Sequence, residues 1–536
     1  MARAPLHRCD AIWIAADAFD AAIIEPLTHL VAAAIARDTR RPVAIYTAGA
    51  APRFLVWKRN DFVTIPLPPP VKLSTIRATL MKTVDRSPLT HGYVFFVNPT
   101  SPRVPPALGR HDKFDRVVFV TRALPTQVPG DLQHALYEFS PVGVGEKVSG
   151  SQFFSSFVAS LLVQKSRSFS ASSAALAGIL SCGAASFRVQ KVRDQGPTEP
   201  ANFSPEEIIA RDACNLRIDR IALTQKWKAW AKMSSFFDAV DGDATVSSHA
   251  RTAEAWGRAI TNRRVGIAVS GGGACAYRAI PLVAECTNQG VPIDAFAGLS
   301  GGALAAAYYC CLGDAGFDIY RQLGPFFSLT LPVVTYSTWP VAFVTDLILG
   351  GERIETLERR FVPVTTGLPA DDKPFAAIVV SGTVGDGVRA SGSLPPGFAP
   401  TREDGVTYTD GGNSALLPVE ILRDYGGADV VLACDISPGP KHGNPLGASW
   451  LARVVHDYTL FGRVLDLWAD LAFFSQRANS SFAKGADAFA VFPPEDVPLF
   501  ESVKFFAAEQ IIAKAAAAQP MLHDAVATLK AAWARL

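Results

Sequence analysis

The chain of 536 residues is too long for one hydrophobic core, so two or three domains are expected. Apolar residues make up 49% and charged residues 19%, a composition that excludes a disordered chain. The 51 basic and 49 acidic residues leave a net charge of +2, which gives no support for nucleic-acid binding because that function needs a clustered basic face.

The N-terminal third alternates short apolar strands with helical segments. Ala22 to Asp38 has the pattern of an amphipathic helix. This alternation predicts a parallel sheet with helices on its faces, so residues 1–190 are expected to form a separate Rossmann-like α/β domain. No G-x-x-x-x-G-K-[ST] loop is present, which leaves a regulatory or structural role. The expected strands are Ala11–Ala15, Pro42–Tyr46, Tyr93–Val97 and Arg116–Thr121.

The next segment is predicted to be a helical linker region over residues 191–260. Gln190 to Asn202 is polar and contains glycine and proline, which is typical of a linker. Ser204 to Glu207 (SPEE) combines a capping serine, a proline at the first helical position and a capping-box glutamate. Helix is therefore expected to about Phe237, with a second helix over His249 to Ile260.

The cysteines and the apolar runs restrict the class of protein further. The eight cysteines are dispersed without C-x-x-C spacing, so buried free thiols are expected rather than zinc ligands or disulfides. No signal peptide is recognisable, and Phe153 to Phe187 is too interrupted by polar residues for a transmembrane helix. The expected location is the cytoplasm, with peripheral contact to membranes.

A second α/β unit is predicted from Arg264. Val265 to Ser270 has the pattern of a buried strand that leads into Gly271-Gly272-Gly273. A helix should follow from about Ala276 to Asn288, ended by Gly290 in the left-handed conformation. Three successive glycine N–H groups before a helix form a nest that binds anions.

The glycine loop has three interpretations. A dinucleotide site fits poorly, because Ala276 stands where G-x-G-x-x-G needs its third glycine and no P-loop lysine follows. An oxyanion hole fits better, since the N–H groups would stabilise the negative oxygen formed when a serine attacks an ester carbonyl. The third interpretation is an ordinary glycine turn.

The next strand leads to a candidate nucleophile. Ile293 to Gly298 is predicted as a short buried strand and Ala303 to Tyr309 as a helix of small residues. Between them Gly298-Leu299-Ser300-Gly301-Gly302 is a G-x-S-x-G pentapeptide. A serine on a sharp strand-to-helix turn is accessible at the helix N-terminus, where the helix dipole favours negative charge. A plain Gly/Ser turn is the alternative.

A candidate base follows further along the chain. Asp410 begins an Asp-Gly-Gly turn whose glycines leave the carboxylate free, although such turns are more often surface turns. Asp410 would take the serine proton directly, or a histidine would intervene. His442 and His456 follow Asp410 and make a triad formally possible. The later predicted elements are strands Ala376–Val380, Val406–Thr409, Asp429–Cys434 and Ala488–Phe492, and a helical segment Val503–Leu536 broken at Pro520.

The order GGG, GLSGG, DGG resembles the patatin-like phospholipases. Residues 388–395 (VRASGSLP) look like the family's RAS-x-x-(hydrophobic)-P segment, and residues 410–418 (DGGNSALLP) look like its DGG…N-x-P run. Within the family the chain is most similar to the neuropathy-target-esterase branch of lysophospholipases. The segments that carry this likeness are Arg258–Gly273, Leu329–Pro332 and Ile354–Thr366.

The resemblance implies a patatin-like three-layer α/β/α hydrolase domain over residues 261–536. It implies an acyl hydrolase of phospholipid or lysophospholipid, with Ser300 as nucleophile and Asp410 as its base, and with no metal or cofactor. The implied oxyanion hole consists of the N–H groups of Gly271, Gly272, Gly273 and Gly301. Two alternatives stay open, a Ser–Asp–His esterase of small soluble esters and a catalytically silent regulator that binds lipid.

One departure from the family's pattern concerns the oxyanion loop. The family usually reads G-G-G-x-[RK]-G, whereas this chain has Cys275 in place of the basic residue and Ala276 in place of the glycine. The change could alter loop geometry, head-group preference or activity. Arg278 follows shortly after and is a candidate to compensate for the missing charge.

Overall fold

The computed structural model describes two compact units, Met1–Gly145 with Pro197–Arg264 and Glu146–Gly196 with Val265–Leu536. The residues described are 11–15, 21–39, 41–47, 53–58, 61–66, 93–98, 116–121, 134–138, 141–142, 188–191, 218–219, 254–325, 327, 337–354, 357, 359–369, 374–394, 398–403, 405–438, 484–493 and 504–536.

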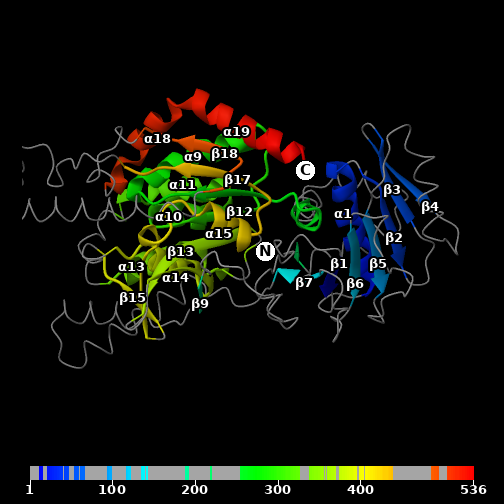
Figure 1. The fold of residues 1–536 in the computed structure, drawn as a ribbon, viewed down its shortest axis with the longest axis horizontal. Helices are drawn as coiled ribbons and strands as arrows, with labels where there is room; N and C mark the ends of the chain where they lie inside the picture. The colour runs from blue at the N-terminus through cyan, green and yellow to red at the C-terminus, as the bar shows by residue number, and fades with distance from the viewer. Residues whose placement is uncertain are drawn as a thin grey trace, which may run out of the picture. The chain divides into compact units, whose positions relative to one another are not determined.

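The first unit contains a seven-stranded sheet in the order β4-β3-β2-β5-β6-β1-β7. Its β2, β5, β6 and β1 run parallel, as predicted. Three further strands were not predicted: β7 extends the parallel part, and β3 and β4 add an antiparallel edge. Helix α1 (Ala21–Thr39) links β1 to β2 (Figure 1), and its residues 28–36 are buried. The strands are β1 Ala11–Ala15, β2 Val43–Thr47, β3 Arg53–Lys58, β4 Asp61–Pro66, β5 Tyr93–Asn98, β6 Arg116–Thr121 and β7 His134–Glu138.

A second helical segment, residues 254–260, packs on α1 in this unit. A Cβ added to Gly257 would lie 3.3 Å from the Ala34 side chain, and Arg37 of α1 forms an ion pair with Glu254 at 2.5 Å. These two helices are the ones that the described residues of this unit contain. The Rossmann-like arrangement of the whole domain therefore stays a prediction.

Two short strands lie where none was predicted, one in the predicted linker region and one at the end of the predicted N-terminal domain. Ile218–Asp219 (β10) pairs in parallel with Pro141–Val142 (β8), which interrupts the helix predicted to Phe237. Arg188–Lys191 (β9) pairs antiparallel with β14 (Phe375–Ser381) in the second unit. The linker prediction at Gln190 used local polarity, which does not distinguish a loop from an edge strand whose partner lies far along the chain.

The second unit contains a nine-stranded mixed sheet. Its main path is β15-β16-β13-β12-β11-β17-β18, while β14 joins β13 to β9. The strands β18, β17, β11, β12 and the first half of β13 run parallel. The strands of the main path are β11 Val265–Val269, β12 Ala295–Gly298, β13 Arg360–Leu368, β15 Thr401–Glu403, β16 Val406–Asp410, β17 Val430–Asp435 and β18 Ala488–Val491.

Strand β13 connects the parallel and antiparallel parts of this sheet. Its first half pairs in parallel with β12, so that Pro363 stands opposite Gly298. Its second half pairs antiparallel with β16, so that Thr365 stands opposite Asp410. The ends of β12 and β16 are therefore placed two residues apart along the same strand.

Helices cover both faces of the parallel half. Val265, Ile267 and Val269 of β11 pack into the core formed with α9 and α10, whereas Ala268 packs into the core that includes α15. This alternation explains why each strand is apolar throughout, since both of its faces are buried. The helices are α9 Ala279–Asn288, α10 Gly301–Leu312 and α15 Val419–Asp424.

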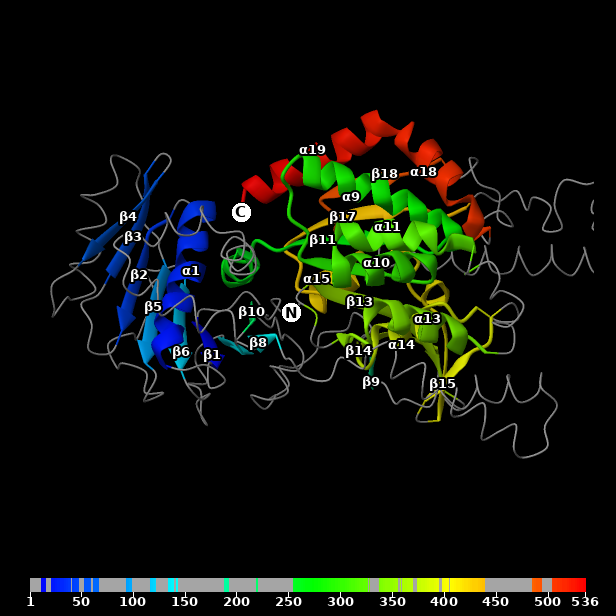
Figure 2. The same cartoon turned by 180° about the vertical axis from the view of Figure 1, so that it is seen from behind.

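The last described segment is helical, as predicted, and forms α18 (Ala508–Ala516) and α19 (Gln519–Ala534). The break lies just before Pro520, which occupies the first turn of α19, where proline is tolerated. Both views show α19 alongside α9 (Figures 1 and 2), and Glu285 of α9 contacts His523 of α19 at 2.9 Å. Within the described ranges, no helix combines the length and apolarity needed to cross a bilayer.

Candidate active site

Ser300 lies on a sharp turn between β12 and α10. Its backbone has φ 53° and ψ −128°, and Asn262 is the other non-glycine residue with positive φ among the residues described. Such a conformation is strained for a residue with a Cβ and is characteristic of functional turns. The predicted strand–turn–helix is confirmed, and the positive end of the α10 dipole lies at the serine.

Close backbone contacts explain the glycines of the pentapeptide. A Cβ at Gly298 would lie 2.4 Å from the carbonyl oxygen of Gly302, so strand and helix approach too closely for any side chain. A Cβ at Gly301 would lie 2.1 Å from the carbonyl oxygen of Gly273. The turn at Ser300 and the glycine loop after β11 are therefore in direct backbone contact.

The glycine loop presents unused hydrogen-bond donors beside Ser300. A Cβ at Gly271 would lie 3.4 Å from the Cβ of Ser300, which places the loop at the serine. The backbone N–H groups of Gly271, Gly272, Gly273 and Gly301 have no acceptor anywhere in the described structure. Gly271 and Gly301 are buried, while Gly272 and Gly273 are partly exposed. Successive N–H groups without a protein acceptor at the start of a helix form a nest for an anion, so this geometry supports an anion-binding role.

Asp410 ends β16 and is fully buried. Its Oδ1 accepts a hydrogen bond from the Gly412 N–H at 2.8 Å, whereas its Oδ2 is buried without any hydrogen-bond partner in the described structure. Burial raises the pKa of this carboxyl to about 6, while the Gly412 N–H and the nearby Ser300 side chain oppose the rise. Ser300 therefore lies near the Asp410 carboxyl, whose Oδ2 accepts no hydrogen bond from the described residues.

The structure brings most of the predicted site residues together. Ser300, Asp410 and the glycines 271–273 and 301 converge where β11, β12 and β16 end. His442 and His456, the candidates for a triad, lie outside the described residues. The choice between dyad and triad is therefore left to experiment.

Sequence reasoning missed the residues that hold the backbone of Ser300 and Asp410. The Ser300 N–H donates to both the carbonyl oxygen and the Oγ of Ser391, at 3.2 and 3.1 Å. The Asp410 N–H donates to the carbonyl oxygen of Ser393 at 2.6 Å. Both acceptors lie in the RAS segment, Ser391 as the last residue of α14 (Val384–Ser391) and Ser393 two residues after it. In the sequence, the likeness of this segment to the family's RAS motif was the sign that could have linked it to the site.

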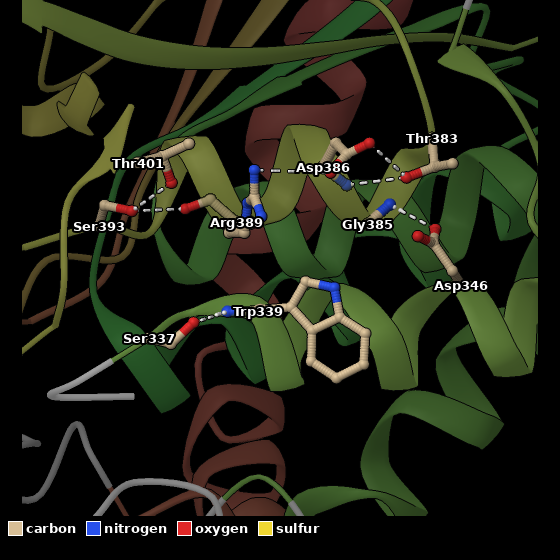
Figure 3. Close-up of polar contacts among 9 residues, drawn as sticks. All are labelled: Ser337, Trp339, Asp346, Thr383, Gly385, Asp386, Arg389, Ser393 and Thr401. Atoms are coloured by element: carbon tan, nitrogen blue, oxygen red, sulfur yellow. Dashed lines mark hydrogen bonds and ion pairs between the residues drawn. The ribbon is translucent and has the colours of Figure 1, made fainter. Parts of the chain in front are cut away.

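Helix α14 is anchored at its other end by buried polar groups (Figure 3). Thr383 caps the helix by accepting from the Asp386 N–H at 3.1 Å, and Asp346 accepts from the Gly385 N–H at 2.7 Å. Burial raises the pKa of Asp346 to about 7, helped by the charge of Asp386 and opposed by Thr383, the Gly385 N–H and Arg389. These contacts fix the helix whose other end holds Ser300 and Asp410.

The altered positions of the glycine loop are buried. Cys275 and Ala276 are both fully buried in the short helix η2 (Gly273–Arg278). Burial raises the pKa of the Cys275 thiol to about 12, which excludes it as a thiolate nucleophile at neutral pH. Helix η2 leads directly into α9, so the helix predicted from about Ala276 begins slightly earlier and in tighter 3₁₀ geometry.

Comparison with known proteins supplies relatives. No family model matches the chain. An uncharacterized NTE family protein of Mycobacterium tuberculosis is 31% identical over 191 residues, which cover 33% of this chain and 32% of that protein. Lysophospholipase nte1 of Aspergillus niger is 27% identical over 251 residues, which cover 42% of this chain and 16% of the relative. Lysophospholipase NTE1 of Phaeosphaeria nodorum is 29% identical over 192 residues, covering 33% and 12%.

These relatives confirm the resemblance to the neuropathy-target-esterase branch. The matched part spans about a third of the bacterial relative and less than a fifth of the fungal ones. The likeness therefore concerns one region of larger proteins.

Proposed function

We propose that this chain is a serine esterase that cleaves acyl esters of phospholipid or lysophospholipid through a Ser300–Asp410 dyad. The observation that carries the proposal is the buried Asp410 Oδ2, which has no hydrogen-bond partner among the described residues and belongs to a carboxyl next to Ser300. A buried carboxylate oxygen without a donor is unfavourable, and a role as proton acceptor accounts for it.

Each step of the proposed acyl transfer has a residue that would carry it out. Ser300 Oγ attacks the ester carbonyl carbon while Asp410 accepts the hydroxyl proton, and the carbonyl oxygen becomes an oxyanion. The four unpaired N–H groups of Gly271–Gly273 and Gly301 would hold that oxyanion. Collapse of the intermediate expels the alcohol, which takes the proton from Asp410. Asp410 then activates water, which releases the fatty acid and restores Ser300.

The substrate class is inferred from the relatives. Two of them carry the name lysophospholipase, and the likeness extends to this chain over a third or more of its length. Such a substrate presents its ester at a micelle or membrane surface, so peripheral membrane contact is part of the proposal. We further propose the patatin-like arrangement for this unit, because helices cover both faces of its parallel strands.

The deciding experiment measures fatty-acid release from phosphatidylcholine and lysophosphatidylcholine by wild type, Ser300→Ala and Asp410→Asn. We expect release by wild type and a loss of at least about 10³-fold in both variants, since members of such a unit fail together. A His442→Ala/His456→Ala variant that keeps its activity supports the dyad, whereas loss of activity favours the triad. Absence of release by wild type would favour the silent regulator.

The pH dependence gives a second test of the dyad. Asp410 must be ionised to accept a proton, and burial raises its pKa to about 6. We expect kcat/KM to fall about tenfold per pH unit below pH 6, as for a single essential base. A pH–rate profile measured from pH 4.5 to 8 checks this, and a flat profile down to pH 4.5 would contradict Asp410 as the base.

A further inference from the structure

The glycine loop lacks its basic residue at Cys275, yet a cation lies one helical turn away. Helix η2 is a 3₁₀-helix, in which side chains three residues apart eclipse, so Arg278 lies on the same side as Cys275. The charge of Arg278 opposes the rise in pKa of both the Cys275 and Cys434 thiols, which places the guanidinium near both.

The Arg278 guanidinium is buried without a carboxylate partner. The residue is 1% exposed, and no carboxylate oxygen lies within 4.0 Å of the guanidinium in the part of the chain that the structure describes. Its Nη1 and Nη2 donate to the carbonyl oxygens of Ile436 and Pro493 at 3.5 and 3.4 Å, and the group lies 5.4 Å from the Phe492 ring centre. A buried unpaired cation is unfavourable and therefore calls for a functional explanation.

The contacts of Ile436 connect this cation to the loop. The Ile436 N–H donates to Ser270 Oγ at 2.9 Å, and its carbonyl oxygen accepts from Arg278. Ser270 directly precedes the glycine loop and Arg278 ends the helix that follows it. A Cβ at Gly272, between them, would lie 3.0 Å from the same carbonyl oxygen. Ile436, the first residue after β17, therefore contacts the segments at both ends of the glycine loop.

We propose that Arg278 is a positioning residue of the oxyanion loop, which it anchors to the ends of β17 and β18 while supplying the positive charge absent at Cys275. This inference rests on the proposed esterase activity. The charge lies behind a loop whose free N–H groups would receive a negative oxygen, and buried charges act strongly there because little water screens them. The role predicts an effect on kcat rather than on substrate binding.

The test compares Arg278→Met, Arg278→Lys and Arg278→Ser, the last with and without Cys275→Arg. The readouts are kcat and KM on lysophosphatidylcholine and labelling of Ser300 by a fluorophosphonate. We expect Arg278→Met to lower kcat by about 10²-fold with KM within about threefold, as for misplacement of a catalytic group. Arg278→Lys should recover part of the loss, and Cys275→Arg should raise kcat of Arg278→Ser at least tenfold.

The stability of the variants separates positioning from packing. Arg278 has no carboxylate partner among the described residues that its removal would leave uncompensated, so Arg278→Met should unfold near the wild-type temperature while its kcat falls. A wild-type kcat in Arg278→Met, or no gain from Cys275→Arg, overturns the role of Arg278 alone. If wild type neither hydrolyses the lipid nor reacts with the fluorophosphonate, the proposed function and this inference fall together.

Discussion

Two strand-to-helix turns lie side by side in the second unit and differ in which groups they present. The turn after β12 strains one serine into positive φ and passes at once into the α-helix α10. The turn after β11 uses three glycines and a 3₁₀-helix, and the glycine N–H groups find no acceptor among the residues that the structure describes. The first turn presents a side chain and the second presents backbone.

The difference shows how one sheet edge builds both halves of a proposed acyl-transfer site. A nucleophile needs a side chain that projects from the chain, whereas an oxyanion hole needs donors that no side chain covers. The two turns touch through Gly301 and Gly273, so neither can change its geometry alone. The predictions below separate what each turn contributes.

The largest effect is expected where the two turns meet. In Gly301→Ala the new Cβ would lie 2.1 Å from the Gly273 carbonyl oxygen, so one turn must move. We expect activity to fall by at least about 10²–10³-fold, as when an oxyanion donor is lost. Gly290→Ala is the control, because an added Cβ there has no atom within 4 Å, although Gly290, unlike Gly301, has positive φ (69°). The control should lose about 1–2 kcal/mol of stability and keep its activity.

The next effect concerns the stability cost of the buried carboxyl. The pKa of Asp410 is about 6 in the folded protein, above its unfolded value, so its stabilising contribution is complete below about pH 4 and is lost as pH rises through 6. Asp410→Asn keeps an acceptor for the Gly412 N–H without the charge. We expect the variant to be more stable than wild type by up to about 3 kcal/mol at pH 8.

Urea unfolding of Asp410→Asn and wild type at pH 4 and pH 8 measures this difference. The advantage of the variant should disappear at pH 4, where wild type is protonated as well. An Asp410→Asn variant that is less stable than wild type at pH 8 would contradict a desolvated carboxylate at this position.

The sequence allowed the elements that carry the two turns to be predicted, because their signals are local. The apolar run before Gly271, the pentapeptide at Ser300 and the Asp-Gly-Gly turn at Asp410 each combine a strand with the glycines that its tight turn needs. Gly290 likewise ends α9 with positive φ, as predicted from its place after the helix. Local periodicity was sufficient for these elements.

The supports of the site could not be predicted in this way, because they depend on pairing over long distances in the chain. Ser391 contacts Ser300 across 91 residues, and nothing in the local pattern of α14 indicates that its end holds the turn at Ser300. Strand β13 went unpredicted as a strand, although it pairs with β12, β14 and β16. Register between distant strands is decided by tertiary packing, which a single sequence does not display.

A smaller effect is expected from the hydroxyl that supports the strained turn. Ser391→Ala removes the Oγ that accepts from the Ser300 N–H and donates to the Val364 carbonyl oxygen, but keeps the neighbouring carbonyl acceptor of the Ser300 N–H. We expect kcat to fall about tenfold, the equivalent of one neutral hydrogen bond. Ser393→Ala is the matched control, since its buried Oγ contacts Arg389 and Thr401 while its backbone carbonyl holds Asp410. Equal kcat losses in the two variants would contradict a specific role of Ser391.

The smallest effect is expected at Cys275, on the buried side of the glycine loop. Cys275 is fully buried, and burial raises the pKa of its thiol to about 12, so almost no thiolate is present at pH 8. Iodoacetamide should leave Cys275 unlabelled in the native protein and label it after unfolding in urea, as read by peptide mass spectrometry. Labelling of Cys275 in the native protein would show that the reagent reaches the buried side of the glycine loop. That result would contradict a rigidly held loop.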